Sequence, residues 1–184
     1  LSGGTATLSS TTPSSISKFG NVYILGISLS GTPSGNETLT VNPALNSIFD
    51  AVGNAVSTSQ SNNSISLNDK LAPTITGVTL ASDNSSITVT FNEAVYNTNS
   101  GSGSLEVSDF VFALSGGTAT LSSTTPSSIS INGNEYTLGI SLSGTPNGSE
   151  TLTVNPVSSS IYDLAGNVAS TSQSNNSISL NDKL

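Results

Sequence analysis

The sequence predicts an all-β protein built from antiparallel β-sandwiches in tandem, and three observations support this prediction. First, Leu1–Leu71 and Leu114–Leu184 are copies of each other without gaps, and 14 of the 71 paired positions differ. Second, Val, Ile and Leu alternate with Ser and Thr in short segments, which is the period of a half-buried strand. Third, clusters of Gly, Pro, Asn, Asp and Ser separate these segments every eight to twelve residues.

The duplication sets the expected domain organisation. The 42 residues Ala72–Ala113 occur once, directly before the second copy, so a whole repeat unit has 113 residues. We therefore expect two domains, residues 1–71 as the back part of one unit and residues 72–184 as a complete unit. Repetition on this scale is typical of array proteins.

The first three strands of the complete unit fall largely in the segment that occurs once. Alternating apolar and polar residues predict strands at Thr74–Leu80, Ile87–Tyr96 and Asp109–Leu114. In the second of these, Ile87, Val89 and Phe91 share the face expected to be buried, and the pattern shifts after Glu93, where a bulge or a strand end is expected. In the third strand, the phenylalanines at positions 110 and 112 share one face.

The remaining strands lie in the part common to both copies. Four are expected: one that starts at Thr118 and is bent or divided at Pro126, then Tyr136–Leu142, Glu150–Val154 and Ser177–Leu180. Asn132-Gly133 is the strongest short hairpin motif in the chain. Seven antiparallel strands at this spacing are the profile of an immunoglobulin-like sandwich. An odd number of strands places the two ends of a unit at opposite poles, so consecutive units would stack as a rod.

The first unit is expected to be incomplete at its N-terminal side. Leu1 corresponds to the end of the third strand, so the first two strands and nearly all of the third are missing. An open sheet edge and an uncovered apolar face should result, and both are unfavourable in water. Either this unit is a fragment of a longer array, or strands from another chain complete it.

Charge and hydropathy exclude two classes of partner. The formal net charge is −8, with 11 acidic residues, three lysines and no arginine. Such a chain cannot neutralise phosphates, so nucleic-acid binding is not expected, and binding to an anionic membrane surface is disfavoured. No apolar run approaches the roughly 20 residues that span a bilayer, so direct membrane insertion is not expected.

Composition also argues against an enzyme. The chain has no His and no Cys, which removes Ser-His and Cys-His nucleophile pairs and ordinary zinc or copper sites. The acidic residues are few and lie in repeated loops without aromatic platforms for a sugar. We expect a non-enzymatic protein.

Calcium is the one cofactor that the acidic residues indicate, because Ca²⁺ takes six to eight oxygen ligands from carboxylates, amides and carbonyls. The seven-strand topology brings four candidates towards one pole of the complete unit, and a fifth, at the end of the preceding unit, would reach the same pole through the linker. The candidate ligands are Glu93, Asp109, Asp163 and Asn167, joined by Asp69. The alternative is structural: Asp163 would close an Asx-turn with Gly166 at positive φ, Glu93 would cap a strand end, and Asp109 would cap the turn before its strand.

The ordered segments APTITGVTL, ITVTFNEAVY, SDFVFAL, GSETLTVNP, IYDLAGN and SISLNDKLAP resemble the bacterial Ig-like tandem repeats of very large secreted surface proteins. These families include adhesins and motility-associated proteins, and the resemblance covers the whole 113-residue unit. It implies an extracellular or cell-surface location and a structural role as stalk or spacer, often rigidified by Ca²⁺. The implied partners are neighbouring repeats of the same or an identical chain.

Two alternatives to the spacer role follow from the same residues. The chain would be a subunit of an extracellular filament joined by strand donation, as the truncated first unit indicates. Otherwise it would be an adhesive module whose loops bind a carbohydrate, a cell-surface polysaccharide or a protein ligand.

Overall fold

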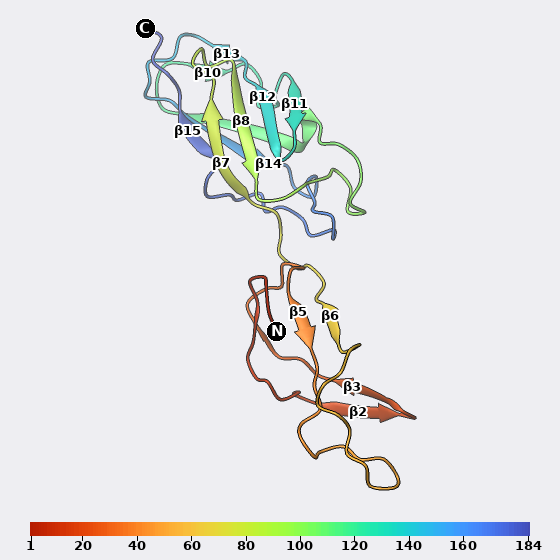
Figure 1. Ribbon diagram of the computed structural model, residues 1–184. Helices are drawn as coiled ribbons and strands as arrows, with labels where there is room; N and C mark the ends of the chain where they lie inside the picture. Colours follow the sequence, from red (N-terminus) through yellow and green to blue (C-terminus); the bar gives the residue numbers. More distant parts are fainter. The chain divides into compact units, whose positions relative to one another are not determined.

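The computed structural model describes all 184 residues. The chain forms two compact units, Leu1–Leu71 (unit 1) and Ala72–Leu184 (unit 2) (Figure 1). Both consist of short antiparallel strands, and the single helical segment is a 3₁₀ turn, η1 (Val107–Asp109). This confirms the all-β prediction. The structure has no helix with the length and apolar character of a membrane span.

The larger sheet of unit 2 has four antiparallel strands in the order β11-β12-β8-β7. These are β7 (Ile75–Leu80), β8 (Ser86–Phe91), β11 (Ile129–Asn132) and β12 (Glu135–Gly139). The register of the β7–β8 pairing shifts in β7, between Ile75 and Gly77, and β8 ends at Phe91. The expected extension to Tyr96 was wrong, because Tyr96 leaves the sheet and forms an isolated bridge with Tyr162.

The second sheet of unit 2 has three strands in the order β15-β14-β9. These are β9 (Phe110–Ser115), β14 (Thr151–Pro156) and β15 (Ser177–Ser179). A small separate pair consists of β10 (Thr120–Leu121) and β13 (Leu142–Ser143). The expected strand from Thr118 is therefore divided, with Pro126 between β10 and β11. The expected strand Tyr136–Leu142 also splits, because the chain leaves the larger sheet after Gly139 to pair with β10.

The two sheets of unit 2 enclose one apolar core. The larger sheet and the smaller sheet both contribute buried side chains, so unit 2 is a β-sandwich. The predicted burial of Ile87, Val89 and Phe91 is confirmed. Phe110 and Phe112, which were predicted to share one face of their strand, are both buried. The Phe91 ring meets the ring of Tyr136 edge to face, with ring centroids 5.7 Å apart, a geometry that aromatic pairs prefer.

Unit 1 repeats the local pairing of the back part of unit 2 and lacks the front strands. Its three strand pairs are β1 (Thr7–Leu8) with β4 (Leu29–Ser30), β2 (Ile16–Phe19) with β3 (Val22–Leu25), and β5 (Thr38–Thr40) with β6 (Ser64–Ser66). At the offset of 113 residues they correspond to β10 with β13, β11 with β12, and β14 with β15, and the paired residues correspond as well. Nothing in unit 1 corresponds to β7, β8 and most of β9.

The missing strands leave an apolar face of unit 1 in solvent. Tyr23 is 55% exposed, whereas its counterpart Tyr136 is 3% exposed. Val41 is 43% exposed and its counterpart Val154 is fully buried. The predicted uncovered face is confirmed. Since these paired residues are identical, their exposure differs only because of what packs against them.

Candidate functional site

Two of the predicted calcium ligands lie close together in unit 2. Glu93 follows the end of β8 and is half-buried, and Asp163 is fully buried in the loop between β14 and β15. A carboxylate oxygen of Glu93 lies within 4.8 Å of one of Asp163. Two oxygens that share a calcium ion, each at about 2.4 Å, can be separated by up to about 4.8 Å. The pair therefore fits two positions of a calcium coordination sphere, whose remaining oxygens would have to come from other groups.

Asp163 and Asn167 form a closed turn through four hydrogen bonds and Gly166. The Asn167 amide N–H donates to Oδ1 of Asp163 at 2.8 Å, and the Asn167 side-chain amide donates to Oδ2 at 2.7 Å. The backbone N–H groups of Asp163 and Gly166 close the turn at 3.0 and 3.2 Å, with Gly166 at φ +84°. This is the conformation of the structural alternative, and it uses one lone pair of each carboxylate oxygen.

Unit 1 contains the same turn, although its front strands are missing. Asn54 donates to Asp50 through its backbone and side chain, both at 2.8 Å. These donated hydrogen bonds, first that of the Asn54 side chain, lower the pKa of the Asp50 carboxyl below its usual value. Because the turn forms in both units, local sequence is sufficient to make it. A cation is not needed to explain its shape.

Asp109 lies outside the pair that Glu93 and Asp163 make. It ends the 3₁₀ turn η1, and its Oδ2 accepts the N–H of Glu106 at 2.7 Å. Burial is the largest influence on the Asp109 carboxyl and raises its pKa. Its backbone carbonyl also accepts the N–H of Val157 at 2.8 Å. The hydrogen bonds of Asp109 therefore hold the turn before β9, which is the structural role expected for it as the alternative to calcium binding.

Asp69 belongs to unit 1, where its carboxylate also serves a turn. Its Oδ1 accepts the backbone N–H of Leu71 at 2.8 Å. The counterpart in unit 2, Asp182, accepts the N–H of Leu184 in the same way, at 2.9 Å. The role of Asp69 as a calcium ligand stays a prediction.

Sequence reasoning missed a buried carboxylate that accepts several backbone hydrogen bonds, Glu150, which it placed only at the start of a strand. Its side chain is fully buried. Oε1 accepts the N–H groups of Thr118 and Ala119 at 2.7 and 2.9 Å, and Oε2 accepts the N–H of Asn147 at 3.1 Å. Glu37 of unit 1 makes the corresponding bonds to Thr5, Ala6 and Ser34.

These donors stabilise the ionised form of both glutamates. The N–H of Ala119 has the largest influence on Glu150, and the N–H of Ala6 has the largest influence on Glu37. Although burial acts in the opposite direction, the bonds lower the pKa of each carboxyl to about 2. Each glutamate therefore ties the start of its own strand to a turn about 30 residues earlier.

The Gly-Gly turn leaves room for the glutamate. A Cβ atom on Gly117, at φ +62°, would lie 2.1 Å from Cδ of Glu150. Gly4 has the same relation to Glu37, with 2.1 Å to its Cδ. The motif LSGGTATL is thus a turn closed by a distant carboxylate. The sequence feature that could have revealed it is the pairing of both Gly-Gly turns with an invariant Glu 33 residues after the second glycine.

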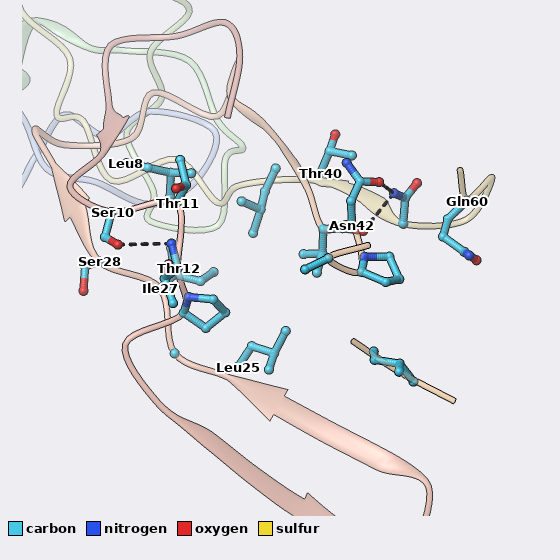
Figure 2. A pocket seen from close by; sticks show the side chains of 18 of the residues that line it. Leu8, Ser10, Thr11, Thr12, Leu25, Ile27, Ser28, Thr40, Asn42 and Gln60 are labelled. Atoms are coloured by element: carbon cyan, nitrogen blue, oxygen red, sulfur yellow. Dashed lines mark hydrogen bonds between the residues drawn. The ribbon is translucent and has the colours of Figure 1, made fainter. Parts of the chain in front are cut away.

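Unit 1 carries an apolar groove of about 640 Å³ on its uncovered face. We call it the unit 1 groove. Figure 2 shows Leu25 at its floor, Ile27 and Thr12 on one wall, and Thr40 and Asn42 on the other. Leu39, Val41 and Ile48 complete its apolar lining.

Comparisons with protein-family models, with curated proteins and with solved structures found no match for this chain. Its functional features are therefore those of the two units themselves. They are a carboxylate pair contributed by two different loops of unit 2, two buried glutamates bonded to backbone N–H groups, and the apolar groove of unit 1.

Proposed function

We propose that this chain is a non-enzymatic structural repeat, a stalk or spacer segment of a large extracellular bacterial surface protein of the adhesin type. The strand order of unit 2 supports an Ig-like assignment. Sheets ordered β7-β8-β12-β11 and β9-β14-β15 match the A-B-E-D and C-F-G sheets of immunoglobulin constant-type domains. The resemblance of the segments to secreted tandem repeats supports the surface location.

The observation that carries the spacer proposal is that the chain enters and leaves unit 2 at opposite ends of β7. At the entry end, the Ile75 N–H donates to the side chain of Gln173 at 2.9 Å. At the other end, the Asn84 side chain bonds the backbone of Asn181 twice, at 2.8 and 2.9 Å. The six residues of β7 separate these ends by about 20 Å. Units joined in series at such ends extend the chain instead of folding it back.

The buried carboxylates accept hydrogen bonds within the protein, and this supports a structural role for the chain instead of a catalytic one. A catalytic acid or base must reach a substrate proton, whereas Glu150 and Asp163 are fully buried and accept hydrogen bonds from the protein. Every buried polar side-chain atom of the chain has a partner. This pattern favours a rigid, internally satisfied module.

The test is the length of tandem arrays. Proteins with one, two and three copies of residues 72–184 would be compared by small-angle X-ray scattering. The spacer proposal expects the maximum dimension to rise by a constant increment for each added unit. A maximum dimension that grows only as the cube root of mass, as for a collapsed globule, would contradict it.

The filament subunit is the second candidate, and the exposed groove of unit 1 favours it. Val41 and Ile48 are exposed there, whereas the same residues of unit 2, Val154 and Ile161, are buried. A concentration series in analytical ultracentrifugation separates the candidates. A filament subunit forms open-ended polymers as concentration rises, and a spacer segment keeps one mass.

A further inference from the structure

We propose that Asn132 of unit 2 is a site of spontaneous covalent modification, at which the side-chain amide is lost as ammonia and the tip of the β11–β12 hairpin gains an aspartate or an isoaspartate. The co-reactant is water, and no enzyme is required. This inference goes beyond the spacer role and holds whether or not the chain is a stalk.

The reaction is the one that an Asn-Gly sequence permits. The backbone nitrogen of Gly133 gives up its proton to water and attacks Cγ of Asn132. A new bond from this nitrogen to Cγ closes a five-membered succinimide ring, while the bond from Cγ to Nδ2 breaks and ammonia leaves. Glycine favours the attack because it has no side chain beside the nucleophilic nitrogen.

Water then opens the succinimide ring at either of its two carbonyl carbons. Cleavage of the new bond between Cγ and the nitrogen leaves an aspartate in an unchanged backbone. Cleavage of the original peptide bond leaves an isoaspartate, in which the backbone runs through Cβ and Cγ. Each product contains one more carboxylate than the parent chain.

The chain contains two Asn-Gly pairs, Asn132-Gly133 and Asn147-Gly148. The sequence alone assigns both the same reactivity. The structure separates them, because the two pairs differ in exposure, in hydrogen bonding and in the space beside the glycine.

Both reacting groups of the first pair are free. The Asn132 side chain is exposed and makes no hydrogen bond within the protein. The Gly133 N–H also donates no hydrogen bond to the protein. A Cβ atom on Gly133 would meet nothing within 4 Å, so the surroundings leave room for the succinimide ring.

Contacts hold the second pair in place. The Asn147 N–H donates to Oε2 of Glu150 at 3.1 Å, and Oδ1 of Asn147 accepts the N–H of Ser149 at 3.0 Å. Beside the glycine, a Cβ atom on Gly148 would lie 3.2 Å from Cβ of Asp182. Because the Asn147 amide is fixed by its own hydrogen bond, Cγ is not free to turn towards the Gly148 nitrogen. The structure therefore selects Asn132 as the reactive residue.

The modification would change the hairpin that carries it. Asn132 lies directly opposite Glu135 in the last pair of the β11–β12 ladder. An aspartate there would place two negative charges opposite each other, which destabilises an antiparallel pair. An isoaspartate would add one carbon to the backbone between β11 and the turn. Either product would loosen the tip of the hairpin, at the edge of the four-stranded sheet.

Unit 1 is an internal control, because it has the same hairpin without the reactive residue. Its β2–β3 pair carries Phe19 at the position of Asn132, and Ser34 stands at the position of Asn147. Neither side chain can form the succinimide ring. The proposed reaction therefore alters only one of the two copies.

The test follows the intact chain during incubation at mildly alkaline pH. Peptide mapping by mass spectrometry should show a gain of one dalton at Asn132 at least ten times faster than at Asn147. Chromatography of the modified peptide should separate two isomers, and electron-transfer fragmentation should identify one of them as isoaspartate. In the chain unfolded in urea, the two residues should react at similar rates, because the contacts that hold Asn147 are then lost.

Matched variants test the site and its effect. Asn132→Phe, which introduces the residue of unit 1, should abolish the modification at this position and keep the circular dichroism spectrum of the parent chain. Asn132→Asp, which mimics one product, should lower the hydrogen-exchange protection of the amide at position 135 several-fold. Adding Glu135→Val, again the residue of unit 1, should restore most of that protection, because it removes the opposing charge.

Three outcomes would overturn the proposal. The first is an unmodified Asn132 in the folded chain after the urea-unfolded chain has been converted. The second is equal rates at Asn132 and Asn147 in the folded chain, which would mean that the structure does not select between them. The third is conversion to aspartate without any isoaspartate, which would mean that water hydrolyses the side chain directly and no succinimide forms.

Discussion

Oε1 of Glu150 accepts the backbone N–H of Thr118 at 2.7 Å across 32 residues of sequence. This bond joins the start of β14 to the turn that follows β9, and Ala119 donates to the same oxygen. Because two N–H groups point at one carboxylate oxygen, the bond depends on the negative charge. It therefore makes the stability of the fold sensitive to pH.

We expect the melting temperature to fall as the pH drops from about 4.5 to about 2. The folded pKa of Glu150 is about 2, against an ordinary value of 4.5. Because the folded pKa is depressed, the stabilisation is complete above the unfolded pKa and is lost as the pH falls through the folded pKa. Glu37 acts in the same direction, and Asp109, whose pKa is raised, acts in the opposite one.

Thermal unfolding at a series of pH values from 7 to 2 measures this dependence. The variant Glu150→Gln separates Glu150 from the other carboxyls. It should melt at a lower temperature at pH 7, and its melting temperature should fall less between pH 4.5 and 2. A variant that reproduces the full pH dependence of the parent would show that Glu150 is not its source.

Gly117→Ala should destabilise unit 2 more than Gly133→Ala. Both glycines have φ near +60°, where an L-residue costs roughly 1–2 kcal/mol. A Cβ on Gly117 would also collide with the Glu150 carboxyl, whereas a Cβ on Gly133 meets nothing within 4 Å. Urea denaturation of the two variants compares them directly. Equal losses would show that Glu150 can move away without cost.

Identical residues in the two units should respond differently to truncation. Ile161 is fully buried, so Ile161→Ala should cost about 2–5 kcal/mol of the free energy of unfolding of unit 2. Ile48 is 54% exposed, so Ile48→Ala should cost unit 1 less than about 1 kcal/mol. Hydrogen exchange under increasing urea reports on each unit separately. Equal costs would mean that the unit 1 groove is covered in solution.

Calcium binding stays a prediction from the sequence, and the Glu93–Asp163 pair identifies where to test it in unit 2. If calcium binds, EDTA should lower the melting temperature and increase interdomain flexibility. Glu93→Gln should remove the response to calcium. Asp50→Asn, in the corresponding turn of unit 1, is the matched control and should leave it intact. Melting and scattering profiles that are the same with and without chelator would exclude calcium binding.

Much of the fold of unit 2 was predictable from alternation and turns, because those patterns reflect local geometry. The buried positions Ile87, Val89 and Phe91 followed from a period of two residues. The end of β8 did not, because Tyr96 is apolar enough to continue the pattern and leaves the sheet to meet Tyr162. The division of the expected strand Tyr136–Leu142 depends on pairing with β10, a partner distant in sequence.

The candidate site was predictable in part for the same reason. Asp163, Gly166 and Asn167 form a turn within five residues, so the sequence alone indicates it. The role of Glu150 was not predictable in this way, since its donors Thr118 and Ala119 lie more than 30 residues earlier. The residues next to a carboxylate at the start of an alternating strand do not indicate whether its side chain is buried.

The sequence by itself determined the unit boundaries that we expected, the hairpins and the turns, because each depends on contacts among near neighbours. The two copies accordingly form the same strand pairs and the same Asp-Gly-Asn turn. Tertiary structure alone decided which identical residues are buried. Tyr136 lies in a core because β8 and β9 pack against it, and Tyr23 lies in solvent because unit 1 has no such strands. Burial depends on distant partners, and a residue's own neighbours do not encode whether those partners are present.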